Sequence, residues 1–200
     1  KNLSHADAVA RNMSGFHDDI DAVHEFWFGA APGRMRDVWF QRDDGFDAEI
    51  RARFGDLHRR AAAGHCDGWA ETPDGALALV IVLDQFSRNL HRGSAEAFAF
   101  EGMALAVAEA AIAKGWDKTF REPDRVFFYL PHEHSEDIEV QRRCVELFSD
   151  TEMGTEYAES HLQLIERFGR FPHRNAVLGR ANTPEEEAYL AQPREGFEAG

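Results

Sequence analysis

Residues 76–83 leave no polar face on a helix. They read Ala-Leu-Ala-Leu-Val-Ile-Val-Leu, and acid, amide and guanidinium groups follow directly within residues 84–89. Thr72 supplies a capping side chain and Pro73 a proline at the first helical position, which predicts that a helix begins there. A helix without a polar face must be surrounded by protein, and this one is too short for a bilayer, which takes about 20 apolar residues. We therefore expect a buried central helix over about residues 73–88.

Amphipathic helices are expected before and after this central helix. Apolar residues at helical spacing, with capping residues or glycines at the ends, predict helices at residues 18–28, 43–63, 95–114, 135–148, 155–168 and 183–192. Residues 125–130 form a short aromatic segment that Pro131 is expected to end. Since no strand pattern occurs in the sequence, we predict an all-α fold. It is a single-domain bundle of antiparallel helix hairpins around the central helix.

The domain organisation and the cell compartment follow from length and composition. Residues 1–15 are expected to form a flexible tail and residues 16–200 one helical domain, since 200 residues suit one domain. Cys66 and Cys144 fit no metal or redox spacing and are expected to be reduced. Residues 1–14 contain no apolar run of signal-peptide length, which predicts a cytoplasmic protein.

The charge of the chain limits its partners. Lys and Arg number 22 against 36 Asp and Glu, a formal charge of −14. Such a surface repels nucleic-acid phosphates and anionic lipids, so we expect neither nucleic acid nor membrane as a partner. A basic protein or peptide partner remains compatible with this acidic surface.

Asp84 is the first candidate for a functional group. It follows the apolar run near the C-terminal end of the helix, where the helix dipole disfavours a carboxylate, so it needs a positive partner. Arg88 is one turn further on and can pair with it. The pair either fixes the end of the helix or belongs to a functional site.

Two basic segments in this acidic chain are the second candidate. Residues 167–184 contain four arginines and a histidine but no carboxylate before Glu185, and residues 85–95 contain Arg88, His91 and Arg92. Arginine suits bidentate recognition of carboxylate or phosphate, so the segments could form an anion-binding pocket. Alternatively they neutralise acids inside the fold, such as Glu133 and Asp137.

Three histidines complete the candidates. His161 lies on the apolar face of its helix, where a hydrogen-bonded core histidine is the commoner outcome and a general acid or base the functional one. His134 is expected at a helix start. A metal site of His132, His134 and Glu136 has weak spacing and no distant third ligand, so we expect no metal and no cofactor.

Several motifs together resemble one family. They are Phe26-Trp27-Phe28-Gly29, Leu83-Asp84-Gln85-Phe86-x-Arg88-Asn89, Tyr129-Leu130-Pro131 with His134-Ser135-Glu136-Asp137, residues 167–175, Leu178-Gly179-Arg180 and Thr183-Pro184-Glu185-Glu186. Over residues 20–197 the chain resembles the bacterial domain-of-unknown-function family numbered 924. The resemblance implies a helical fold similar to the tetratricopeptide-like superfamily and brings no activity with it. Ser87 departs from the family's usual Pro, and His132-Glu133 from a more apolar pair.

Two functions follow as hypotheses. The first is a pocket for a small anionic ligand at the end of the central helix, with Asp84 or His161 as general acid or base. Its ligand-binding residues would be Arg88, Asn89, His134, Glu136, Arg170, Arg174 and Asn175. The second is a tetratricopeptide-like module for a protein partner, in which the polar motifs are a structural ion-pair network. Its anchor candidates are Trp39, Phe40, Trp69 and Trp116, provided that they are exposed.

Overall fold

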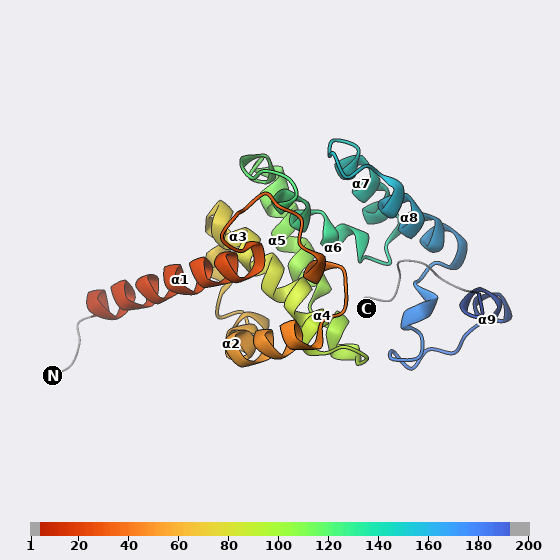
Figure 1. Cartoon of the computed structure of the whole chain (residues 1–200), viewed down its shortest axis with the longest axis horizontal. Coiled ribbons are helices and arrows are strands. Elements are labelled where there is room, and N and C mark those ends of the chain that lie inside the picture. Colours follow the sequence, from red (N-terminus) through yellow and green to blue (C-terminus); the bar gives the residue numbers. More distant parts are fainter. Residues whose placement is uncertain (1–4, 193–200) are drawn as a thin grey trace.

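The computed structural model describes residues 5–192, and side chains from residue 17 onward; this part of the chain has helices and no strand (Figure 1). The α-helices are α1 His5–Phe28, α2 Asp44–Ala62, α3 Pro73–Val80, α4 Ser87–Leu90, α5 Glu101–Ala113, α6 Leu130–Glu133, α7 Ile138–Phe148, α8 Glu156–Phe168 and α9 Pro184–Leu190. Short 3₁₀ turns are η1 Asp37–Trp39, η2 Asp67–Glu71, η4 Ala95–Phe98, η5 Asp117–Thr119, η6 Asp124–Phe128 and η7 Pro172–Arg174. The all-α prediction is confirmed. No helix in the described range combines the length and apolarity that crossing a bilayer requires.

The central helix is continuous from α3 through a π-helical turn, η3 Ile81–Phe86, into α4. Thr72 caps it by accepting a hydrogen bond from the Gly75 amide at 3.2 Å, and Pro73 occupies its first turn. Every residue from 75 to 89 is buried, as expected for a helix without a polar face. The helix runs to Leu90, slightly beyond the predicted end.

Aromatic side chains fill the core beside this helix. The ring of Trp27 in α1 lies 5.7 Å from that of Phe86 and 5.6 Å from that of Phe127, between ring centroids. The connection between α1 and α2 packs onto the same core, because Trp39 Nε1 donates a hydrogen bond to the Trp27 carbonyl oxygen at 2.9 Å. This agrees with the burial of Trp39 and brings the connection close to the end of the central helix.

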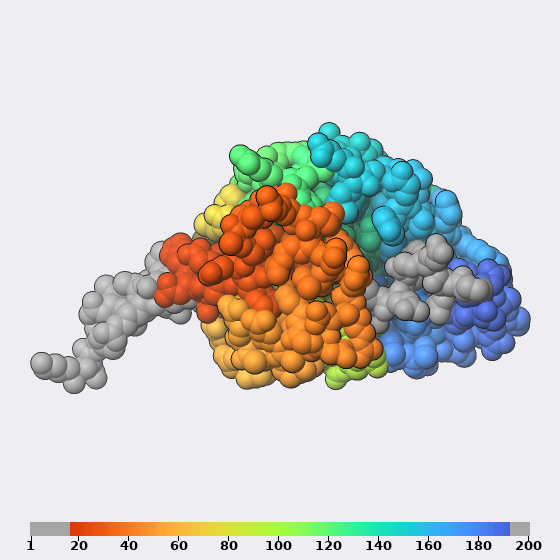
Figure 2. Space-filling model, viewed as in Figure 1, coloured from red at the N-terminus to blue at the C-terminus, as the bar shows by residue number. Residues whose placement is uncertain are grey.

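The C-terminal third builds a smaller second core. α7 and α8 pack against each other as a hairpin, and Leu164, Ile165 and Phe171 form a buried cluster beneath them. α9 follows at the far end of the molecule from α1 (Figure 1). In Figure 2 the orange segments of α1, α2 and their connection and the cyan-to-blue C-terminal segments occupy opposite sides of one face.

Four local expectations were wrong. α1 begins at His5 instead of Asp18 or Asp19, because the alanine-rich residues before them favour continuation of the helix. Residues 95–114 are divided into η4 and α5, since Ser94 bonds to the Glu96 side chain and caps no backbone amide. Pro131 lies in the first turn of α6, where proline is tolerated, and does not end the segment. His134 therefore follows the end of α6 instead of starting a helix.

Candidate functional site

A cavity of about 450 Å³ opens beside the C-terminal end of the central helix. Its walls come from the α1–α2 connection, the end of the central helix, α6, the α7–α8 hairpin and η7. The lining residues are Met35, Trp39, Phe40, Gln85, Arg88, Leu130, Glu133, His134, Phe148, Met153, Gly154, Tyr157, His161, Phe171, His173 and Arg174. A volume of this size is typical of small-molecule sites, which span roughly 300–1,000 Å³.

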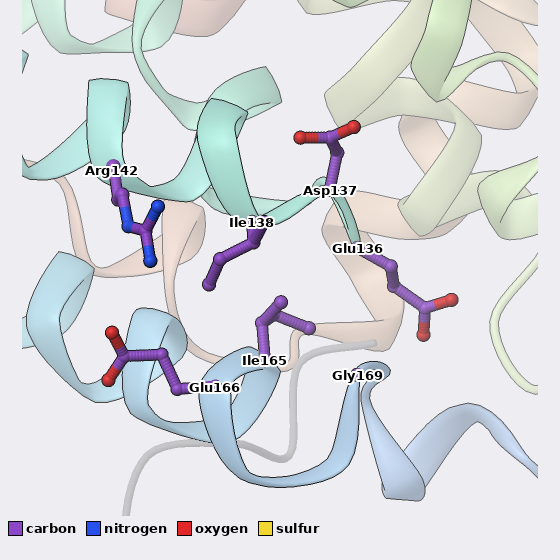
Figure 3. A pocket seen from close by; sticks show the side chains of 7 residues that line it. All are labelled: Glu136, Asp137, Ile138, Arg142, Ile165, Glu166 and Gly169. Atoms are coloured by element: carbon purple, nitrogen blue, oxygen red, sulfur yellow. The ribbon is translucent and has the colours of Figure 1, made fainter.

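A second hollow lies between α7 and α8 and is more open to solvent (Figure 3). Figure 3 shows Ile138 and Ile165 between the helices, with Arg142 and Glu166 on facing helices at one side. Its lining is Glu136, Asp137, Ile138, Arg142, Ile165, Glu166 and Gly169. Three acids against one arginine disfavour an anion, and Asp137 already caps α7. The cavity beside the central helix is therefore the better candidate site.

Asp84 and His134 form a pair at the cavity wall, in which His134 lines the cavity and Asp84 is fully buried behind it. His134 Nδ1 lies 2.8 Å from Asp84 Oδ1, and Gln85 Nε2 donates to Asp84 Oδ2 at 2.6 Å. Burial alone would raise the pKa of Asp84, but its interaction with His134, the charge of Arg88 and the Gln85 hydrogen bond together lower it. Burial, with the charge of Arg88, lowers the pKa of His134. A carboxylate only accepts hydrogen bonds, so Nδ1 of His134 carries the proton. Nε2 makes no hydrogen bond to another residue of the described chain.

Two buried arginines of the cavity lining share the carboxylate of Glu101, which lies outside the lining. Arg88 Nη2 bonds to one oxygen of Glu101, and Arg174 Nη1 bonds to the other at 3.0 Å. Arg174 Nη2 also donates to the His134 carbonyl oxygen at 3.0 Å. Burial lowers the pKa of Arg174, and the nearby charge of Arg88 acts in the same direction against the opposing effect of Glu101. Arg88 Nε is 3.8 Å from Asp84 Oδ1, so the predicted pair exists but is looser than the pair of Asp84 with His134.

Phe98 brings the two guanidinium groups together. Their central carbons lie 5.4 Å (Arg88) and 4.4 Å (Arg174) from the centre of the Phe98 ring. The Nε atoms of both arginines are buried and find no hydrogen-bond acceptor among the described residues. Two cations held side by side with one directly bonded carboxylate leave capacity for a further anion.

The charged groups of the cavity lining are mostly cationic. The cavity is lined by Arg88, Arg174 and three histidines, whereas Asp84 and Glu101 lie outside the lining. Glu133 is the lining's acid, and burial raises its pKa, against the opposing charges of His161 and Arg88. Burial thus acts against the charged form of Glu133. In a chain with a formal charge of −14, this cavity presents mainly cationic and neutral groups.

The opposite wall carries His161. Its Nε2 lies 3.7 Å from Oε1 of Glu133, which is an ion-pair distance beyond hydrogen-bond length. Its Nδ1 is 2.8 Å from the Tyr157 carbonyl oxygen, one turn earlier in α8. His161 and His134 thus reach the cavity from different elements, each with one ring nitrogen held by protein.

The structure brings five of the predicted site residues together. Arg88, His134, His161 and Arg174 line the cavity, and Asp84 lies directly behind His134. Asp84 has no exposed side-chain surface, so any part it takes in chemistry must act through His134.

Asn89 and Arg170 lie outside the cavity lining and bond to other protein groups. Asn89 Nδ2 donates to Asp47 Oδ1 at 2.6 Å, toward α2. Arg170 binds the carboxylate of Glu186 with Nε and Nη2, at 2.7 and 2.8 Å. Both contacts fix a loop or helix end in place.

Glu136 and Asn175 belong to the same kind of network. Glu136 accepts hydrogen bonds from Arg180 and from the Phe171 amide, each at 2.7 Å. Asn175 accepts from Arg180 Nε at 2.8 Å and donates to Asn182 at 2.8 Å. These contacts hold the irregular segment between α8 and α9, and they correspond to the structural alternative considered for the basic loop.

Sequence reasoning missed Glu101 and the apolar lining. Glu101 begins α5, and no local pattern connects it with Arg88 or with Arg174, which is 73 positions away. Met35 and Tyr157 carried no signal of their own. Phe40 had one, as an aromatic anchor candidate for a protein partner.

Asp84, Glu101 and His134 also form the cluster best suited to a metal ion among the described residues. One ligand atom from each lies within 4.8 Å of the others. Arg88 and Arg174 contact this same cluster, so a cation there would face two guanidinium groups. We therefore keep the expectation of no metal.

The fold and the cavity define an all-α protein with a cationic cavity beside a buried central helix. The chain belongs to the family described as bacterial protein of unknown function, DUF924, whose model matches residues 23–194. It is similar to the solved structure of the protein of unknown function ATU0120 from Agrobacterium tumefaciens, with a TM-score of 0.82 and 43% identity. The match covers 88% of this chain and 99% of that one. A search of curated proteins gave no match. The family resemblance is confirmed; the likeness to tetratricopeptide folds stays a prediction.

Proposed function

We propose that the protein binds a small anionic ligand, carboxylate or phosphate, in the cavity beside the central helix. The observation that carries the proposal is the pair Arg88 and Arg174, two buried guanidinium groups that line the cavity and share Glu101. A bound anion would give the two guanidinium groups a further hydrogen-bond acceptor, in addition to Glu101 and to the looser contact of Arg88 with Asp84. Guanidinium groups recognise such oxyanions with paired hydrogen bonds.

His134 would meet the bound head group on the same side of the cavity. Because Asp84 holds the proton on Nδ1, Nε2 is the nitrogen that can accept a proton from the ligand. Asp84 thus acts as a positioning residue, in place of the direct acid–base role considered from the sequence. His161 remains the candidate for proton transfer from the opposite wall.

The alternative of a protein-interaction module has lost its main support. It required Trp39, Phe40, Trp69 and Trp116 to be exposed together. Trp39 and Trp69 are buried, and Trp116 is only half-exposed. Phe40 is exposed, but it lines the cavity.

The test compares arginines inside and outside the cavity. Hexanoate, benzoate and phenyl phosphate would be titrated by calorimetry into the wild type, Arg88→Gln, Arg174→Gln and the control Arg59→Gln, an exposed arginine of α2 outside the cavity lining. We expect at least one probe to bind the wild type, and its Kd to rise about 10- to 100-fold in Arg88→Gln and Arg174→Gln, since each loses a charge-assisted hydrogen bond. Arg59→Gln should keep the wild-type Kd.

Circular dichroism of each variant separates lost binding from lost folding. Arg174→Lys, which retains the charge but not the paired donors, provides an intermediate case for a variant that folds. The proposal fails if none of the three probes binds folded wild type, or if folded Arg88→Gln and Arg174→Gln bind them as the wild type does.

A further inference from the structure

We infer that the ligand is an amphiphile, with one anionic head group and an apolar tail, and that it enters the cavity head first. This inference rests on the proposed function for the head group. It adds the chemical class of the remainder of the ligand. The observations that carry it concern the rim and the walls of the cavity, which the arginines do not explain.

The rim of the cavity is apolar and exposed. Among the described residues, the exposed large hydrophobic side chains are Met35, Phe40 and Tyr157, with 51%, 45% and 66% of their surface accessible. All three line this one cavity. They come from segments far apart in the sequence, the α1–α2 connection and α8. Contiguous exposed apolar surface of this kind marks a binding site, whereas scattered apolar residues do not.

The walls continue this apolar surface inward. Leu130, Phe148 and Phe171 are buried lining residues, and Trp39 lies next to exposed Phe40. Leu130 and Phe148 belong to the main core and Phe171 to the second one. A ligand lying along these walls would contact both cores of the molecule.

In this cavity the exposed side chains are apolar and the arginines are buried, which is the opposite of an ordinary protein surface. The accessible side chains at the rim are apolar, whereas Gln85, Arg88 and Arg174 in its lining are each less than 10% exposed. A small hydrophilic anion would satisfy the arginines and leave the rim in water. A purely apolar ligand would cover the rim and leave the arginines without their additional partner. An amphiphile inserted head first satisfies both.

The experiment is a chain-length series below the critical micelle concentration. Straight-chain carboxylates from butanoate to decanoate, with 1-octanol as the uncharged match for octanoate, would be titrated into the full chain by calorimetry. We expect Kd to fall about fourfold for each added methylene until the chain outgrows the cavity, because each buried methylene contributes a similar increment. Octanol should bind at least tenfold more weakly than octanoate.

Rim variants test where the tail lies. Tyr157→Ser and Met35→Ser should reduce the dependence of Kd on chain length and leave butanoate binding unchanged. Tyr157→Phe, which keeps the ring, should retain the wild-type dependence. Both changes are at exposed positions, so folding is not expected to suffer.

The possible results separate the two proposals. Equal Kd values along the series, with binding still lost in Arg174→Gln, would overturn the amphiphile and leave the anion site standing. Octanol binding as tightly as octanoate, with the usual chain-length dependence, would overturn the anion site and retain the apolar one. No binding by any member would overturn both.

Discussion

The pKa values of the buried histidines in this protein depend on burial and on the groups that each histidine contacts. His58 donates through Nε2 to Ser87 Oγ at 2.8 Å, because the Ser87 hydroxyl proton is used on the Leu83 carbonyl at 2.6 Å. Burial, with the charges of His91 and Arg59, lowers the pKa of His58 to about 4. Burial has the same effect on His132. Both imidazoles are thus neutral in the folded protein at pH 7.

The two histidines predict a pH dependence of stability. Their pKa is about 4 when folded and about 6.5 when unfolded, so between these values the unfolded state binds more protons. The free energy of unfolding should therefore fall as the pH is lowered from about 6.5 to 4. His58→Gln, which keeps a donor for Ser87, should reduce that fall by about 2 kcal/mol.

Urea unfolding monitored at pH 7 and pH 4.5 measures this difference. His65→Gln, at an exposed position, serves as the control and should keep the wild-type dependence. An equal fall in the wild type and His58→Gln would contradict the assignment of a neutral buried imidazole.

At the residue scale the sequence predicted Asp84, Arg88, His134 and Arg174 as candidates. It predicted the pair of Asp84 with Arg88, which exists at 3.8 Å, but not the pair of Asp84 with His134. Helical spacing placed Arg88 one turn from Asp84, whereas the ionisable group closest to Asp84 is His134, 50 positions later. Local spacing carries information on contacts within one helix, and pairings between helices depend on the packing of the whole chain.

The start of the central helix depends on one glycine. A β-carbon at Gly75 would lie 2.2 Å from the Trp69 carbonyl oxygen and 2.8 Å from Thr72 Oγ1. The backbone of η2 and the capping side chain therefore occupy the space that another residue would need. Since Thr72 caps the helix through the Gly75 amide, the close approach and the cap belong to the same structure.

Gly75→Ala should lower the free energy of unfolding by about 2 kcal/mol, because backbone cannot move aside as a flexible side chain would. Gly55→Ala is the matched control in α2, where a β-carbon would meet nothing within 4 Å. That change should instead stabilise by about 0.5–1 kcal/mol. Chemical denaturation of the two variants measures both free energies of unfolding. Destabilisation of the same size in both variants would contradict the proposed collision at Gly75.

At the element scale, most helices could be predicted and their ends only in part. The caps at Thr72, Asp43 and Thr183 were visible as sequence patterns, and each is made in the structure. The helix expected from Ser135 is instead capped by Asp137 and begins at Ile138. The π turn at residues 81–86 was not predictable, because an apolar run reads the same in α and π geometry. It lies where the polar groups of the site begin, a place where such turns are frequent.

At the scale of the whole molecule, the site is a junction between two cores. The cavity lies between the aromatic core around the central helix and the smaller core beneath α7 and α8. The second core is connected to the segment before α9 by the bonds of Glu136 with Arg180 and of Arg170 with Glu186. These contacts place η7, and with it Arg174, against the end of the central helix.

The sequence predicted an anion site at this end of the molecule, but not which residues belong to it. It grouped Arg170 and Asn175 with Arg174, and Glu136 with His134, because the members of each group are close in the chain. The turn at η7 directs Arg174 to Glu101, while its neighbours bond within their own loop. The apolar rim could not be foreseen either, since Met35 and Tyr157 meet only after the chain has folded.

The most direct test of the central claim is a crystal structure of the full chain with octanoate. The account predicts carboxylate oxygens about 2.7–3.1 Å from guanidinium nitrogens of Arg88 and Arg174, with the alkyl chain running outward past Phe40 and Tyr157. Octanoate with its carboxylate at the rim and its tail at the arginines would contradict the account. So would a cavity that stays free of octanoate at a saturating concentration.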